Sequence, residues 1–75
     1  MKCTFAVTVI DHSRKQVDQI ISKDFHKVFK FISSDNSRDC LYGFCVTDRM
    51  GHEHVGTYRT KELLTESINE YLANH

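Results

Sequence analysis

The chain has 75 residues, the size of one small domain, so we expect a single domain over residues 1–75. Hydrophobic residues make up 40% of the chain and proline is absent, a composition typical of a folded globule rather than a disordered segment. Ten basic residues balance ten acidic residues, so the net charge gives no general attraction to nucleic acid or to a membrane surface.

The cysteines and the N-terminal segment bear on the cellular compartment. Three cysteines with no CxxC pair indicate free thiols in a reducing compartment, and we expect a cytoplasmic protein. The apolar run near the N-terminus is interrupted by threonine and is much shorter than the roughly 20 residues of a membrane span. We therefore expect no membrane contact.

The first predicted strand lies in "CTFAVTVID", residues 3–11. Cys3, Phe5, Val7 and Val9 alternate with smaller residues, the period of two expected for a strand with one buried face. Asp11 ends this strand. Residues 16–21 are then predicted to turn back and pair with residues 5–10 as a hairpin.

A second interpretation covers the same segment. The apolar residues from Val17 to Ile32 also fit one long helix beginning at a capping box of Ser13 and Gln16, which would give the element order βαββα. We favour the hairpin because the corresponding segment, residues 42–60, contains Gly51 and Gly56, and glycine is a poor helix former. Sequence alone leaves both open.

A helix is predicted after the hairpin. Ser22 is its expected N-cap and Asp24 lies in its first turn, where the helix dipole favours negative charge. Its apolar stripe follows helical spacing and consists of Phe25, Val28, Phe29 and Ile32. The polar residues 33–39, "SSDNSRD", form the expected connector between the two halves.

The second half repeats this order of signals. In "CLYGFCVTD", residues 40–48, the alternating residues Cys40, Tyr42, Phe44 and Val46 predict another strand. Gly51 can supply a positive φ in the turn that follows. Thr60 is then the expected N-cap of a second helix, with Glu62 in its first turn. The apolar stripe of this helix is Leu64, Ile68, Tyr71 and Leu72.

The recurrence predicts an internal repeat of residues 3–34 and 40–73. Residues 3–11 align with 40–48, and residues 17–25 align with 55–63. The identical pairs are Cys3/Cys40, Val9/Val46, Asp11/Asp48, Val17/Val55 and Lys23/Lys61. We therefore predict an α+β fold, a tandem ββα repeat with a four-stranded antiparallel sheet and two helices on one face. One such unit could not close a core alone.

Residue types that bind metals or catalyse reactions are present but lack a diagnostic pattern. The candidate metal ligands are Cys3, Cys40, Cys45, His12, His52 and His54. Cys40 and Cys45 fall on opposite faces of one strand, and no close pair of cysteines or HxxxH pair exists. Neither a nucleophile elbow nor a phosphate-binding glycine loop occurs. We expect no metal, no cofactor and no enzymatic activity.

Charge is distributed unevenly along the chain. Residues 1–34 carry six basic and three acidic groups, a net +3, whereas residues 35–75 carry four basic and seven acidic groups, a net −3. Glu62, Glu66 and Glu70 form an acidic row on the second helix, and the first helix is predicted to carry a basic row. The candidate basic binding residues are Arg14, Lys15, Lys23, His26, Lys27 and Lys30. Either the two rows neutralise each other, or one of them binds a partner.

The sheet face away from the helices is a second candidate surface. Its expected residues are small or apolar and uncharged, and they are Thr4, Ala6, Thr8, Ile10, Leu41, Gly43, Cys45 and Thr47. Such a face is either an ordinary threonine-rich exposed sheet or a site of protein binding.

These features lead to two functional hypotheses. We expect a non-enzymatic cytoplasmic module that binds another protein or self-associates as a homodimer. Small size and the lack of catalytic equipment are shared with the accessory and inhibitor proteins of phages and other mobile elements. The alternative is a nucleic-acid-binding protein that uses the basic first helix with Arg14 and Lys15, and its affinity would fall steeply with salt.

Overall fold

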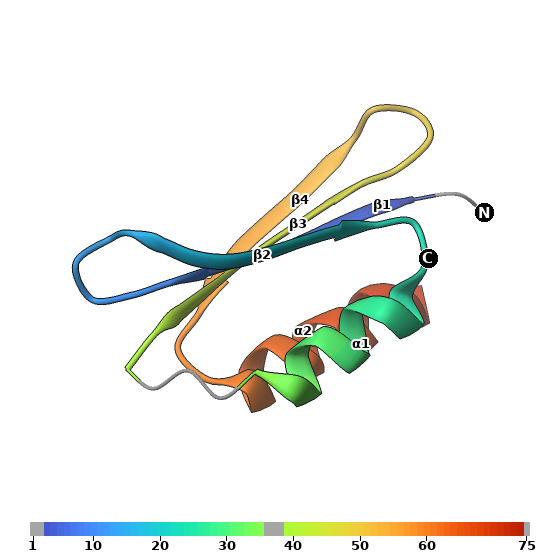
Figure 1. Ribbon diagram of the computed structural model, residues 1–75. Coiled ribbons are helices and arrows are strands. Elements are labelled where there is room, and N and C mark those ends of the chain that lie inside the picture. The colour runs from blue at the N-terminus through green and yellow to red at the C-terminus, as the bar shows by residue number, and fades with distance from the viewer. Residues whose placement is uncertain (1–2, 36–38, 75) are drawn as a thin grey trace.

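Four strands and two helices follow one another in the order strand, strand, helix, strand, strand, helix. The computed structural model describes residues 3–35 and 39–74. The elements are β1 (Thr4–Ile10), β2 (Gln16–Ser22), α1 (Phe25–Ser34), β3 (Leu41–Thr47), β4 (Glu53–Tyr58) and α2 (Lys61–Asn74) (Figure 1). The predicted hairpin is confirmed, because β2 pairs with β1 from Gln16 to Ser22. The long helix over this segment, and with it the order βαββα, is wrong.

The strands form one antiparallel sheet in the order β2-β1-β3-β4. The central pair is β1 and β3, whose register places Val7 opposite Phe44. Each central strand also pairs with the strand that follows it in the chain, so β2 and β4 are the two edges. This arrangement confirms the α+β class and the four-stranded antiparallel sheet.

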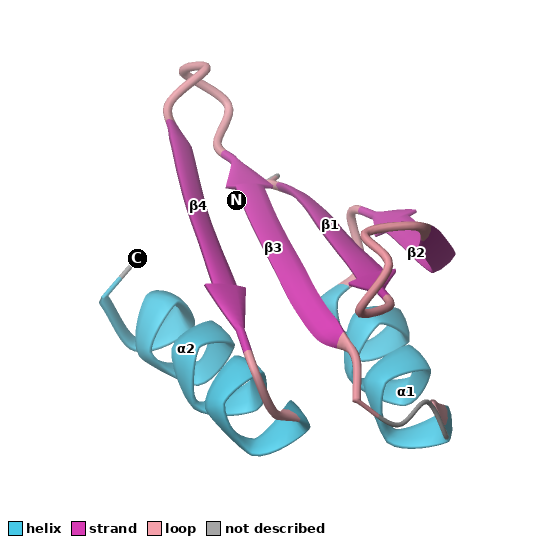
Figure 2. Ribbon diagram, turned by 90° about the vertical axis from the view of Figure 1, so that its left-hand side faces the viewer, coloured by secondary structure: helices cyan, strands magenta, loops and turns pink. Residues whose placement is uncertain are grey.

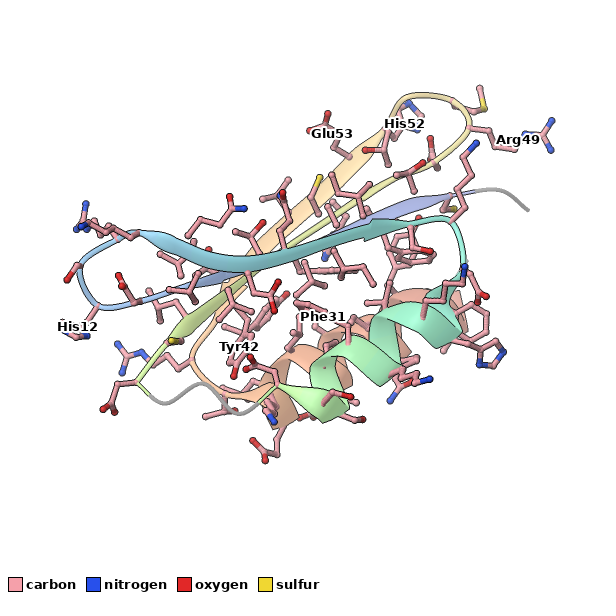
Figure 3. The ribbon with its side chains drawn as sticks, in the orientation of Figure 1. His12, Phe31, Tyr42, Arg49, His52 and Glu53 are labelled. Carbon is pink, nitrogen blue, oxygen red and sulfur yellow. The ribbon has the colours of Figure 1, made fainter. Side chains whose placement is uncertain are left out.

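Both helices lie on the same side of the sheet (Figures 1 and 2). The helix α1 packs under β1 and β2, and α2 packs under β3 and β4. The core between these layers contains most of the residues that were predicted to be buried, whereas Phe25, Phe29, Cys40 and Leu72 are only partly buried and pack against it. Its fully or nearly buried members are Cys3, Phe5, Val7, Val9, Val28, Ile32, Tyr42, Phe44, Val46, Leu64, Ile68 and Tyr71. Phe31, which the sequence analysis left out, also packs against this core from α1 (Figure 3).

The turns of the two hairpins use the same hydrogen bonds. Asp11 Oδ1 accepts from the amides of Ser13 and Lys15, both at 2.9 Å. Asp48 Oδ1 accepts from the amides two and four residues further on, at 2.8 and 2.9 Å. The fourth residue of each turn has a positive φ, 65° at Arg14 and 83° at Gly51. The predicted role of Gly51 is confirmed, and an arginine occupies the same conformation in the first turn.

The predicted alignment of residues 17–25 with residues 55–63 is wrong, because β2 and β4 correspond in a different register. Asp18 lies opposite Val9, and His54 lies opposite Val46, so these two positions of β2 and β4 correspond. Val17 is an extra residue at a bulge in β2, where the pairing shifts between Val9 and Ile10. The extra residue therefore lies in the first hairpin, whereas the alignment placed it in the second turn.

The N-cap of the first helix differs from the prediction, whereas that of the second helix agrees with it. The N-cap of α1 is Asp24, whose Oδ1 accepts from the amide of His26 at 2.9 Å, and not Ser22. Because the helix begins at Phe25, Lys23 precedes it and is not part of the basic row. The N-cap of α2 is Thr60, as predicted, and its Oγ1 accepts from the amide of Leu63 at 3.1 Å.

Candidate protein-binding surface

The face of the sheet that points away from the helices forms a grid of small and apolar side chains, here called the open face. Its most apolar row crosses all four strands through Ile21, Ala6, Cys45 and Val55, which lie directly opposite one another in the strand register. Ile21 is 63% exposed and Val55 is 67% exposed. Two branched aliphatic side chains thus stand in solvent at the two ends of one row.

The neighbouring row is polar but uncharged. It runs through Gln19, Thr8, Gly43 and Thr57. The Gln19 side-chain amide donates to Thr8 Oγ1 at 3.0 Å, which holds the glutamine flat against the sheet. Among the described strand residues with this orientation, Glu53 at the corner of β4 is the only charged one. The open face therefore offers little charge to keep a partner away.

The structure brings the predicted residues of this surface together. Their alternation on β1 and β3 places them on one face of the central strands, and most are half-buried by their neighbours. The residues predicted for this face are Thr4, Ala6, Thr8, Ile10, Leu41, Gly43, Cys45 and Thr47. Sequence reasoning missed the contribution of the edge strands, Ile21 and Val55. Their alternation with the inward-facing Ile20 and His54 is the signal that could have identified them.

The candidate basic residues fall into two separate groups. Arg14 and Lys15 lie in the β1–β2 turn, at one end of the sheet. Lys23 lies at the opposite end of β2, next to the start of α1 (Figure 1). The seven residues of β2 separate Lys23 from this turn by about 20 Å, since a strand advances about 3.3 Å per residue. His26, Lys27 and Lys30 are exposed on α1, so only these three and Lys23 could act as one patch.

The acidic row of α2 and the basic residues of α1 do not pair in the structure. Glu62, Glu66 and Glu70 are all exposed. Across residues 3–35 and 39–74, the single ion pair joins His52 Nδ1 to Asp48 Oδ2 at 3.5 Å within a hairpin turn. Direct neutralisation between the two helices is therefore not seen in the described residues.

The candidate metal ligands are dispersed over the molecule. His12 and His52 lie in different hairpin turns, at opposite ends of the sheet (Figure 3). Cys3 is buried with its Sγ 3.9 Å from the Tyr71 hydroxyl, whereas Cys45 lies on the open face. In the described part of the chain, no group of three or more His, Cys, Asp or Glu side chains could hold a metal ion. Cys3 and Cys45 carry free thiols.

Among the described residues, three groups have clearly perturbed pKa values, and each lies in the core or in a hairpin turn. Burial raises the pKa of Tyr42 to about 12, assisted by the hydrogen bond that its hydroxyl donates to Asp35 at 2.8 Å. Burial and the contact with Cys3 raise the pKa of Tyr71. The amide hydrogen bonds from the β3–β4 turn, above all that from His52, lower the pKa of Asp48. None of these groups lies on the open face.

Neither described helix is long and apolar enough to cross a membrane. Comparison of the chain with protein-family models, with curated proteins and with solved structures finds no match. The function of the chain is therefore inferred from the chemistry of its own surfaces.

Proposed function

We propose that this chain is a non-enzymatic cytoplasmic protein that acts by binding another protein through the open face of its sheet. The observation that carries the proposal is the apolar row that ends in the exposed side chains of Ile21 and Val55. Covering these side chains would remove apolar surface from water at about 25 cal/mol per Å². The helices already bury the other face, so this face is the one left for a partner.

The size of the face favours a different protein over a second copy. Strands lie about 4.8 Å apart and advance about 3.3 Å per residue, so four strands of six or seven residues cover roughly 440 Å². Two copies packed face to face would bury roughly 900 Å² in total, below the approximately 1,200 Å² at which stable interfaces begin. A partner that continues beyond an edge of the sheet can bury more.

The test compares lysine variants on the two sides of the molecule. Ile21→Lys and Val55→Lys place a charge in the apolar row and should leave the fold intact, because both side chains are largely exposed. Ala73→Lys, on the exposed side of α2, is the matched control. We expect the two open-face variants to lose at least about tenfold in affinity for a partner isolated from the native host.

If both open-face variants keep full affinity while the control variant loses it, the partner binds the helical side. Sedimentation of the purified chain alone checks the homodimer, which would appear as a second species that Val55→Lys removes.

Nucleic acid binding through α1 is the second candidate. It is favoured by the exposed basic residues Lys27 and Lys30, which no ion pair among the described residues neutralises. It is weakened by the distance of Arg14 and Lys15 from that helix. A duplex or single-stranded oligonucleotide would bind with an affinity that falls steeply between about 50 and 200 mM salt, and Lys27→Gln/Lys30→Gln would reduce that salt dependence.

We also propose that the two halves of the chain are copies of one ββα unit. The support is the common set of hydrogen bonds around Asp11 and Asp48 and the common place of the residue with positive φ. The register shift at Val17 would then be an insertion into one copy after duplication.

A further inference from the structure

The outer edge of β4 and the flank of α2 enclose a groove. The helix extends beneath and beyond this edge of the sheet (Figure 2). The groove has a volume of about 430 Å³. Its lining residues come from β4 and from α2, and they include His54, Tyr58, Leu63, Glu66, Ser67 and Glu70. A segment placed alongside β4 would lie directly over this groove.

The edge of β4 presents backbone groups that can pair with such a segment. The amide of Asp48 donates to the carbonyl of His52 at 3.0 Å, and in an antiparallel pair the hydrogen-bonded positions recur at every second residue. His54, Gly56 and Tyr58 therefore pair with β3. Glu53, Val55 and Thr57 turn their amide and carbonyl groups away from it, toward the outer side of the edge.

Aromatic side chains form the wall of the groove. The ring of Tyr58 lies back over Gly56, where a Cβ would come within 2.8 Å of Tyr58 Cζ. The Tyr58 hydroxyl is 2.6 Å from Ser67 Oγ, which fixes the ring against α2. The rings of His54 and Tyr71 contact each other at a tilt of 37°, with centroids 5.8 Å apart. This wall provides apolar surface for the aliphatic part of a long side chain.

The outer rim of the groove is acidic. Glu66 and Glu70 are both exposed on the flank of α2, and none of the described residues that line the groove is a lysine or an arginine. They are four residues apart on the helix, or about 6 Å along its axis. Side chains on the same face of a strand repeat at about 6.6 Å. Two basic side chains at alternate positions of a strand therefore match the spacing of the two carboxylates.

We propose that an extended peptide with Lys or Arg at every second residue adds to β4 as a fifth strand and places these side chains in the groove. The backbone of the peptide pairs with Glu53, Val55 and Thr57. The aliphatic stems pack against Tyr58, and the charged ends reach Glu66 and Glu70. The groove lies on the helix side of the sheet and shares only the backbone of β4 with the open face. The inference goes beyond the proposed function, because this site selects a partner segment by its charge and its alternation.

The test uses a capped peptide of alternating lysine and threonine, KTKTKTKTK, and a control of the same composition, KKKKKTTTT. In an extended strand only the first peptide presents all its lysines on one side. We expect the alternating peptide to bind more tightly, and we expect the amides of Glu53, Val55 and Thr57 to become protected from hydrogen exchange. Equal affinity for the two peptides, or protection elsewhere in the sheet, would overturn the proposal.

Single charge-neutralising variants locate the site. Glu70→Gln removes a carboxylate from the rim of the groove, and Glu62→Gln removes one from α2 outside it. We expect Glu70→Gln to weaken binding about threefold and Glu62→Gln to change it by less than about 1.5-fold, within the range measured for exposed ion pairs. Equal effects of the two variants would show general attraction to an acidic helix and no groove site.

A backbone variant tests strand addition independently. Thr57→Pro removes an amide that points away from β3, a position where an edge strand tolerates proline, and the preceding Gly56 avoids the usual steric clash. We expect it to abolish peptide binding while the far-ultraviolet circular dichroism stays unchanged. Unchanged binding by folded Thr57→Pro refutes strand addition, and if this variant does not fold, the Glu70→Gln comparison decides. Ile21→Lys on the open face must leave peptide binding unchanged, which separates this site from the proposed function.

Discussion

Replacing Arg14 with glycine should stabilise the protein. Arg14 holds a φ of 65°, and the corresponding position of the other hairpin turn is Gly51 at 83°. A left-handed conformation costs a residue with a Cβ roughly 1–2 kcal/mol. Glycine avoids this cost but loses up to about 1 kcal/mol because its unfolded state has more freedom. The net expectation for Arg14→Gly is a gain of about 0.5–1 kcal/mol.

The reverse change provides the matched experiment. Gly51→Arg should cost about 1 kcal/mol, and Arg14→Ala, which removes the charge but keeps a Cβ, should give no gain. For a domain of this size, 1 kcal/mol corresponds to a Tm shift of about 4–8 °C in thermal unfolding followed by circular dichroism. A lower Tm for Arg14→Gly, or an equal gain from Arg14→Ala, would refute the conformational explanation.

Three further predictions concern the stability of the fold. Burial raises the pKa of Tyr42 to about 12, so the stability that this residue contributes is complete below about pH 10 and is lost as the pH rises from about 10 to about 12. In urea unfolding, Tyr42→Phe should remove this loss of stability at alkaline pH. Because the pKa of Asp48 is lowered, the stability that its carboxylate contributes is complete above about pH 4 and is lost as the pH falls through the lowered value. In urea unfolding, Asp48→Asn should make the stability at acidic pH less dependent on pH. Gly56→Ala should displace Tyr58 and cost about 1–2 kcal/mol in the free energy of unfolding, whereas an unchanged value would mean that the ring moves freely.

The central strands were predictable from sequence because each has one fully buried face. In β1 the alternation of Phe5, Val7 and Val9 with smaller residues follows the register of the structure. The edge strand β2 was ambiguous for a physical reason. Ile20 faces the core and Ile21 faces solvent, so with Val17 at the bulge they imitate the spacing of a helix.

The candidate surfaces were predictable only in part, because strand pairing and helix placement are non-local. The residues of β1 and β3 on the open face follow from local alternation. Ile21 and Val55 join them only because β2 and β4 are the edges of this particular sheet. The groove needs the flank of α2 to extend past β4, which no local pattern encodes. Ser22 and Asp24 are both good N-caps, and the structure uses the second.

Site-specific photocrosslinking in the native host shows whether a partner protein binds the open face. A photoreactive amino acid is placed at Val55 or Ile21 on the open face, and at Ala73 on the solvent side of α2 as the control. We expect one protein adduct of defined mass from both open-face positions and none from the control position. Adducts from the control position alone, or no adduct from either open-face position, would contradict binding through the open face.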